Sequence, residues 1–240
     1  MKKITILSGA GLSAESGVKT FRDHDGLWEN YNVMEVCSTQ GWIKDRKVVT
    51  EFYNQRRAEL ATKEPNRAHT VLAQLEKEYR GRFVHLTQNV DNLMERAGAK
   101  ELVHLHGTLT DLRCEACTEV FDIGYAAQDG TQRCPNCGNK RLRHNVVMFG
   151  ESAPEYSKIH EAIRQSSLFI AIGTSGNVID IVSIAREFQH SILIDPNRQT
   201  IESAFKNDEY IDEHFEHFIQ KKAGEAMDDM LKIIEEHMQD

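Results

Sequence analysis

Short apolar runs alternate along the chain with stretches in which apolar residues recur every three or four positions. The runs predict strands at residues 4–7, 82–87, 168–172 and 191–194. The run at residues 168–172 contains no polar residue, which is typical of a strand buried inside a parallel sheet. Helical spacing predicts helices over residues 68–79, 154–163, 178–189 and 227–238. Strands that alternate with helices in this way predict an α/β fold with a mostly parallel sheet.

Small or polar residues follow the predicted strands, at residues 8–11, 88–91, 173–175 and 195–197. Parallel strands end at the same edge of a sheet, where ligands bind in α/β folds, so we expect these segments to form one crevice. Gly9 permits a tight turn, Gly11 lets the main chain approach a pyrophosphate, and Ala14 leaves room for close helix packing. A turn that only connects strand to helix is the alternative. The usual dinucleotide-binding motif has an acidic residue about 20 positions later, at the end of a second strand. Glu29 has this spacing, but no strand precedes it.

Length and charge narrow the class of protein. A chain of 240 residues with 40% hydrophobic content suits one domain with an elaboration, or two unequal domains. The net charge of −8 argues against broad nucleic-acid binding but is compatible with a basic peptide as partner. The apolar stretch near the start is too short for a signal peptide, and no run has membrane-spanning length. We therefore expect a soluble, cytoplasmic protein without membrane or nucleic-acid partners.

Four of the five cysteines form two close pairs, separated by sixteen residues: Cys114, Cys117, Cys134 and Cys137. This spacing lies in the range of zinc sites, and four thiolates complete a tetrahedral shell that has no open position for a substrate. We therefore expect one structural Zn²⁺ in a small ribbon that needs the metal to fold. Disulfides are the alternative. Cys37 stands alone and is expected to be a small buried side chain.

Tyr53 and Arg56 lie three positions apart in a stretch, residues 41–60, that predicts one or two helices. On one helical face, the guanidinium and the phenol could bind a carboxylate together, whereas a solvated arginine beside a half-buried tyrosine is the alternative.

His104 and His106 would face the same way in an extended segment, as two metal ligands could. We expect another role for them, because the cysteines downstream already complete a metal site. Residues 146–151 could pair with an extended peptide or form a buried connecting strand.

Several of these stretches together resemble the sirtuin family of NAD-dependent protein deacylases. Residues 9–22 are similar to the opening motif of the family, and residues 87–93, Thr-Gln-Asn-Val-Asp-Asn-Leu, are similar to the motif that holds nicotinamide and its ribose. Residues 146–151 resemble the substrate strand of the family. The Tyr-x-x-Arg of residues 53–56 resembles the mark of the bacterial-type class III members, which remove acidic acyl groups such as succinyl and malonyl from lysine.

The resemblance implies an α/β fold with a Rossmann-like parallel sheet flanked by helices and a smaller module that combines a zinc ribbon with helices. Residues 1–30, 63–107 and 146–240 would form the Rossmann-like NAD-binding domain. The small domain would combine a helical insertion, residues 31–62, with the zinc ribbon, residues 108–145.

The implied activity is that of a protein-lysine deacylase, acting on succinyl, malonyl and acetyl groups, which transfers the acyl group to ADP-ribose and releases nicotinamide. NAD would be the co-substrate, acylated-lysine peptides or proteins the partners, and the protein a monomer. An ADP-ribosyltransferase or NAD hydrolase on the same scaffold is the alternative, although neither needs the acyl pocket that Tyr53 and Arg56 suggest. A non-enzymatic zinc-ribbon module would leave the polar strand ends without a role.

The resemblance also assigns residues. His106 would be the general base, with Asn89 and Asp91 at the nicotinamide end. The implied NAD-binding residues are Gly9, Ala10, Gly11, Ser13, Ala14, Glu15, Thr20, Phe21, Arg22, Trp28, Gln88, Asn89, Val90, Asp91, His106, Gly173, Thr174, Ser175, Asp195, Asn197 and Ala223. The implied substrate-binding residues are Tyr53, Arg56, Val147, Met148, Phe149, Gly150 and Glu151. Asp195 departs from the family, which usually has asparagine there, and Asp180 stands where proline is common.

Overall fold

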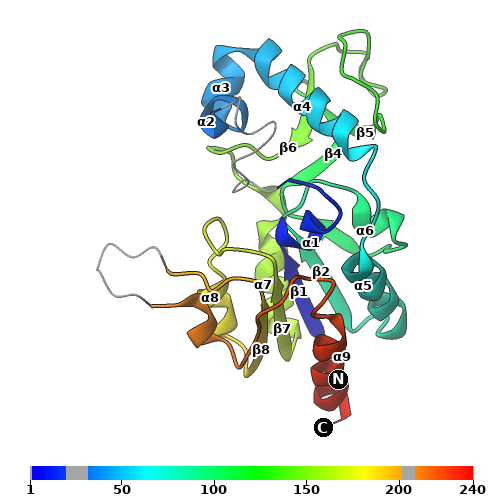
Figure 1. Cartoon of the computed structure of the whole chain (residues 1–240). Coiled ribbons are helices and arrows are strands. Elements are labelled where there is room, and N and C mark those ends of the chain that lie inside the picture. Colours follow the sequence, from blue (N-terminus) through cyan, green and yellow to red (C-terminus); the bar gives the residue numbers. More distant parts are fainter. Residues whose placement is uncertain (1, 20–31, 202–208, 240) are drawn as a thin grey trace.

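A six-stranded sheet forms the centre of the molecule in the computed structural model, which describes residues 2–19, 32–201 and 209–239 (Figure 1). Its strands are β1 (Ile4–Ser8), β2 (Phe83–Thr87), β3 (Leu102–His104), β7 (Leu168–Ile172), β8 (His190–Ile194) and β9 (His217–Ile219). They pair in the order β3-β2-β1-β7-β8-β9, and every pair is parallel. The expected parallel sheet is confirmed.

Helices cover both faces of this sheet because alternate side chains of each strand point to opposite sides. On one face, Ile4, Ile6 and Ile170 pack in a cluster with α5 (Arg67–Glu78) and α9 (Met227–Gln239). On the other face, Leu7 and Phe169 pack with α7 (Ser157–Gln165) and α8 (Ile181–Ala185). The shorter helices of this part are α1 (Gly11–Ala14), α6 (Leu93–Arg96) and the 3₁₀ helices η2 (Pro154–Tyr156) and η3 (Ile211–His214).

A smaller module lies beyond the carboxyl ends of the central strands, at the top of Figure 1. It contains the helices α2 (Val33–Val36), α3 (Thr39–Lys44) and α4 (Arg46–Leu60). Beside them lies an antiparallel sheet of order β5-β4-β6, with β4 (Gly107–Cys114), β5 (Val120–Asp122) and β6 (Leu142–Val146). Both parts come from the stretches expected to form the small domain, although the exact domain boundaries stay a prediction.

The fully buried Arg57 joins α4 to this small sheet. Its guanidinium donates from Nε to the carbonyl of Leu109 (2.7 Å) and from Nη2 to Nδ1 of His144 (2.8 Å). A buried charge needs such hydrogen bonds, because its desolvation would otherwise be very costly. Phe52 of α4 shares a hydrophobic cluster with Leu109, so the helices and the ribbon pack as one unit.

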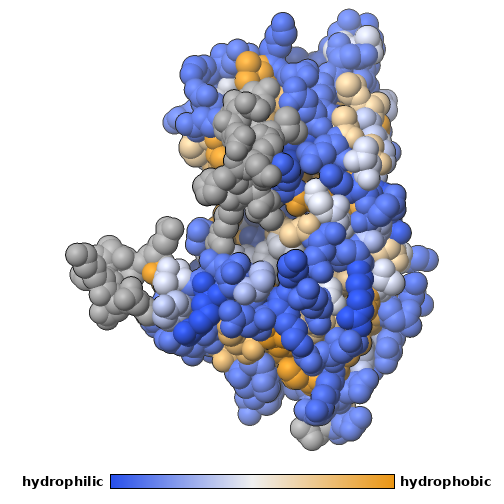
Figure 2. Space-filling view, in the orientation of Figure 1, coloured by the Kyte–Doolittle hydropathy of each residue, from blue (hydrophilic) through white to orange (hydrophobic). Residues whose placement is uncertain are grey.

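Hydrophilic residues dominate the face shown in Figure 2, in keeping with the 28% content of charged residues. None of the described helices combines the length and the apolar character that crossing a bilayer requires.

Candidate active site

A cavity of about 860 Å³ lies between the large sheet and the small module. The segments that follow β1, β2, β7 and β8 all line it, so the four polar strand ends converge as the sequence predicts. The predicted NAD-binding residues that line the cavity are Gly9, Ala10, Gly11, Ser13, Ala14, Gln88, Asn89, Val90, Asp91, His106, Gly173, Thr174, Ser175, Asp195 and Asn197. All seven predicted substrate-binding residues line the same cavity: Tyr53, Arg56, Val147, Met148, Phe149, Gly150 and Glu151.

Two glycine turns pack against each other at the floor of this cavity. The N–H of Gly11 donates to the carbonyl of Gly173 (2.9 Å). A Cβ on Gly11 would lie 2.5 Å from Cα of Gly173, and a Cβ on Gly9 would lie 2.7 Å from the Gly173 carbonyl oxygen. Real Cβ atoms do not approach other atoms so closely, so the contact between the turns requires glycine here.

Buried hydrogen bonds fix the loop after β2 against α1. Ser13 donates to Oδ2 of Asp91 (2.8 Å) and accepts from Nδ2 of Asn89 (3.2 Å). His69 lies behind Ser13, with Nε2 at 3.3 Å from Oγ, and its Nδ1 accepts the N–H of Asn66 at the start of α5 (3.1 Å). Burial raises the pKa of Asp91, while the hydrogen bonds from Ser13 and Leu93 oppose that rise. The network therefore holds Asn89 and Asp91 in fixed positions at the cavity wall.

The ring of His106 is held between a carbonyl and a phenol. Nδ1 lies 3.0 Å from the carbonyl oxygen of Gln88, and Nε2 lies 2.8 Å from the hydroxyl of Tyr156. Because the carbonyl only accepts, the ring proton belongs on Nδ1, which leaves the lone pair on Nε2. Burial lowers the pKa of His106, and the Gln88 carbonyl opposes this effect. The imidazole is therefore neutral at pH 7 and able to accept a proton.

His104, two residues earlier, has a different environment. Its Nδ1 lies 2.8 Å from the carbonyl oxygen of Asn89, and its Nε2 lies 2.7 Å from the carboxylate of Glu95. Burial works against the charged ring, but the hydrogen bond and the charge of Glu95 outweigh it and raise the pKa of His104. His104 does not line the cavity and instead supports the loop that carries Asn89.

Tyr53 and Arg56 reach the cavity from α4, on the face that their spacing predicts. Arg56 pairs with Glu59 through Nη1 (3.2 Å) and donates from Nη2 to the carbonyl of Lys19 (3.3 Å). Burial raises the pKa of Tyr53 and raises that of the adjacent Cys37 to about 11. Cys37 is buried as expected, but it also lines the cavity beside Tyr53, a position that its isolated place in the sequence does not signal.

The segment of residues 147–151 is attached on one side to the small module. Phe149 donates its N–H to the carbonyl of Cys37 (2.8 Å) and accepts from the N–H of Thr39 (3.0 Å). The carboxylate of Glu151 accepts from both Nη atoms of Arg143 (2.6 and 2.7 Å) and from the N–H of Met148 (3.0 Å). These bonds shape the segment and keep it at the cavity wall.

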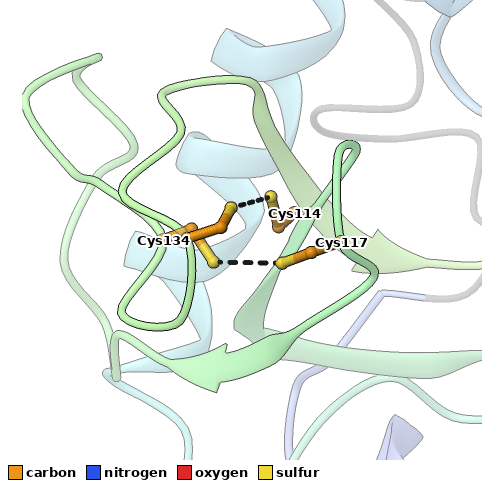
Figure 3. Close-up of side chains that lie close together, drawn as sticks. Cys114, Cys117 and Cys134 are labelled. Carbon is orange, nitrogen blue, oxygen red and sulfur yellow. Dashed lines mark hydrogen bonds between the residues drawn. The ribbon is translucent and has the colours of Figure 1, made fainter.

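The four paired cysteines meet at the end of the ribbon (Figure 3). Their Sγ atoms lie within 4.8 Å of one another, with Cys114 and Cys137 at 3.7 Å and Cys117 and Cys134 at 3.5 Å. A tetrahedral zinc site with Zn–S bonds of about 2.3 Å has sulfur atoms about 3.8 Å apart, so the donor set fits one Zn²⁺. None of the four cysteines lines the cavity, which suits a structural ion.

Comparison with known proteins identifies the family of the chain. A model described as the Sir2 family matches residues 9–180. The chain belongs to the Sir2 family. This confirms the resemblance to sirtuins that the sequence motifs predict.

Several relatives of this Sir2-family protein carry the name NAD-dependent protein deacylase. One from Campylobacter jejuni is 47% identical over 240 residues, which cover 100% of this chain and 99% of the relative. Another from Helicobacter hepaticus is 43% identical over 202 residues, which cover 77% of this chain and 79% of the relative. These names agree with the class of enzyme that the sequence motifs predict.

Solved structures show the same fold. A Sir2 homologue in complex with NAD superposes with a TM-score of 0.83 at 32% identity, over 98% of this chain and 90% of that chain. A mutant Sir2 homologue in complex with ADP ribose has a TM-score of 0.83 at 31% identity, over 99% of this chain and 94% of that chain.

Some residues that the Sir2 motifs single out lie away from the cavity. Glu15 accepts the N–H of Gly224 (2.6 Å) and so holds the segment before α9. Ala223 is buried in the hydrophobic cluster of α5 and α9. Neither lines the cavity, and their contact with NAD stays a prediction. The remaining four, Thr20, Phe21, Arg22 and Trp28, lie outside the described residues.

Replacing Cys134 with serine is expected to release zinc from this Sir2-family protein and to unfold the ribbon, because a neutral hydroxyl is a poor substitute for a thiolate. Zinc content after gel filtration measures the first effect. Trp42 fluorescence measures the second, since its indole N–H donates to Glu115 in the ribbon (3.2 Å). Cys37→Ser is the matched control and should retain the ion. A wild-type protein that purifies with a folded ribbon and no zinc would contradict the prediction.

Proposed function

We propose that this Sir2-family protein is an NAD-dependent protein-lysine deacylase that accepts succinyl, malonyl and acetyl groups. Its products would be free lysine, nicotinamide and an acylated ADP-ribose. One observation carries the proposal: the imidazole of His106 lines a single cavity with Tyr53 and Arg56, a pair that could bind a carboxylate. The names of the relatives support the dependence on NAD and the class of reaction.

The cavity offers groups that suit a dinucleotide along its length. The turns at Gly9 and Gly173 line the cavity, where small residues would let a pyrophosphate approach the main chain. Asp195 and Asn197 would lie near the adenosine ribose, while Asn89 and Asp91, held by Ser13, would orient the nicotinamide end. NAD itself supplies the glycosidic bond that breaks and the ribose that receives the acyl group.

His106 would accept a proton from a ribose hydroxyl at Nε2. The Gln88 carbonyl fixes the tautomer that leaves this nitrogen unprotonated, and burial favours the neutral ring. A base works best when it is unprotonated at the working pH and within hydrogen-bond reach of the proton that it removes. His106 meets the first requirement, and it lines the cavity in which the sugar would bind.

The acidic acyl group would be recognised by Arg56. Its side chain is only 13% exposed, and Glu59 is its carboxylate partner at 3.2 Å. Glu59 has a second cation nearby, Nζ of Lys63 at 3.7 Å. A succinyl carboxylate could therefore replace Glu59 on the guanidinium while Glu59 keeps Lys63, and the phenol of Tyr53 would add a donor.

Replacing Arg56 with methionine should lower kcat/KM for succinyl-lysine peptides by about 10- to 150-fold, the effect of losing a charge-assisted hydrogen bond. Acetyl-lysine peptides have no carboxylate on the acyl group, so their kcat/KM should change less than about threefold. Arg164→Met removes an exposed arginine of α7 away from the cavity and serves as the control. An equal loss on both substrates would leave the carboxylate role of Arg56 without support.

Mass spectrometry of a succinylated peptide tests the reaction itself. Incubation with NAD should remove the succinyl mass and release nicotinamide, whereas incubation without NAD should leave the peptide unchanged. A gain of the mass of ADP-ribose on the peptide would instead identify an ADP-ribosyltransferase. Release of nicotinamide without any change in the peptide would identify an NAD hydrolase.

A further inference from the structure

Tyr156 lies at the cavity although its place in the sequence marks it only as an apolar position of a helix. It ends the 3₁₀ helix η2, between the segment of residues 147–151 and α7. The side chain is half-buried and lines the cavity, with its ring centroid 5.8 Å from that of His106. Its hydroxyl oxygen is 2.8 Å from Nε2 of His106.

The direction of this hydrogen bond follows from the other side of the ring. The proton of neutral His106 lies on Nδ1, toward the Gln88 carbonyl, so Nε2 can only accept. The phenol of Tyr156 must therefore be the donor. Other titratable groups of the neighbouring segments have partners of their own, since His104 pairs with Glu95 and Asp91 accepts from Ser13 and Leu93.

We propose that Tyr156 is a positioning residue for His106, whose phenol orients the neutral ring in the free protein and yields Nε2 to a substrate hydroxyl. The first half rests on the contacts alone. The second half rests on the proposed function, in which a ribose hydroxyl gives its proton to His106. Nε2 has a single lone pair in the plane of the ring, so it cannot accept hydrogen bonds from the Tyr156 phenol and from a ribose hydroxyl at the same time. Binding of the sugar would therefore displace the phenol from this nitrogen.

A hydrogen bond donated to the neutral form of a base disfavours its protonation. Loss of the Tyr156 hydroxyl should therefore raise the pKa of His106 in the free protein by about 0.5 to 1. With the sugar bound, the phenol is no longer on Nε2, so the same substitution should have almost no effect. A tyrosine that only filled space would not alter the pKa in either state.

NMR titration of ¹⁵N-histidine-labelled protein tests this with the wild type, Tyr156→Phe and, as control, Tyr79→Phe, which removes the hydroxyl of a tyrosine at the end of α5 away from the cavity. Each protein is titrated alone and with saturating ADP-ribose. Among the free proteins, we expect Tyr156→Phe to have a higher pKa of His106 than the wild type and Tyr79→Phe. With ADP-ribose bound, we expect the pKa of His106 to be the same in all three proteins.

Equal pKa values of His106 in the free wild type and free Tyr156→Phe would overturn the positioning role. A difference that persists with ADP-ribose bound would overturn the exchange with the sugar. Failure of ADP-ribose to bind would count against both the proposed function and this exchange, while the titration of the free protein would still decide the positioning role.

Discussion

Replacing His106 with alanine is expected to slow acyl removal by about 10²- to 10⁴-fold, the usual contribution of a positioned general base. The hydrogen bonds of the Gln88 carbonyl and of Tyr156 hold the ring with Nε2 unprotonated, and no other described histidine lines the cavity. The bonds that fix Asn89 and Asp91 involve Ser13, Thr87 and Leu93 and not His106, so the wall of the cavity should survive the substitution. Affinity for NAD should therefore change only a few-fold.

Single-turnover rates on a succinyl-lysine peptide, measured together with NAD affinity by calorimetry, separate the two effects. His160→Ala removes an exposed histidine of α7 and should match the wild type in both measurements. A His106→Ala rate near that of the wild type would refute the assignment of the base. A lost rate that parallels a lost affinity would show that His106 acts in binding instead.

The central strands could be predicted because both faces of the sheet are covered. Leu168–Ile172 is buried at every position, so the strand carries an uninterrupted apolar run. The edge strand β9 (His217–Ile219) has three residues and an exposed first position, which leaves no pattern to recognise. The expected helix over residues 178–189 is shorter, because the carboxylate of Asp180 accepts the N–H of Ser183 (3.0 Å) and caps α8 there.

The site was predictable where its residues are close in sequence. Two Cys-x-x-Cys pairs indicate a metal site directly, because this spacing lets both thiolates of a pair bind one ion. Tyr156 and His69 have no such signal, since Tyr156 lies 50 residues from His106 and His69 lies 56 residues from Ser13. The fold of the sheet brings these pairs together, and a lone tyrosine or histidine in a helix pattern gives no indication of it.

Three buried histidines should make the protein sensitive to acid. Burial lowers the pKa of His69 to about 4 and the pKa values of His85 and His144 to about 3. In the unfolded chain each would have a pKa of about 6.5, so the unfolded state takes up protons first as the pH falls. Each histidine then removes about 1.4 kcal/mol of stability per pH unit below about 6.5, or about 4 kcal/mol per unit for all three.

Other groups do not cancel this trend between pH 6 and 5. His104 and Asp91 oppose it, because their raised pKa values make the folded state bind a proton more tightly. The lowered pKa of His106 acts in the same direction as those of the three buried histidines, so two groups stand against four. The lowered pKa values of Glu115 and Glu151 cost stability only below about pH 4.5, where unfolded carboxylates become protonated. A typical protein has a free energy of unfolding of roughly 5–15 kcal/mol, and the free energy lost between pH 6 and 5 is a large part of it.

Urea unfolding at pH 7, 6, 5.5 and 5 should therefore show a free energy of unfolding that falls ever more steeply below pH 6.5. His85→Gln removes one of the three titrating groups and should reduce the slope by about a third, even if the variant is less stable at pH 7. His160→Gln, at an exposed position, should leave the slope unchanged. Zinc loss at low pH would affect all three proteins alike, so the difference between the two variants isolates the histidine. Equal slopes in the wild type and His85→Gln would show that the buried imidazole becomes protonated without unfolding the sheet.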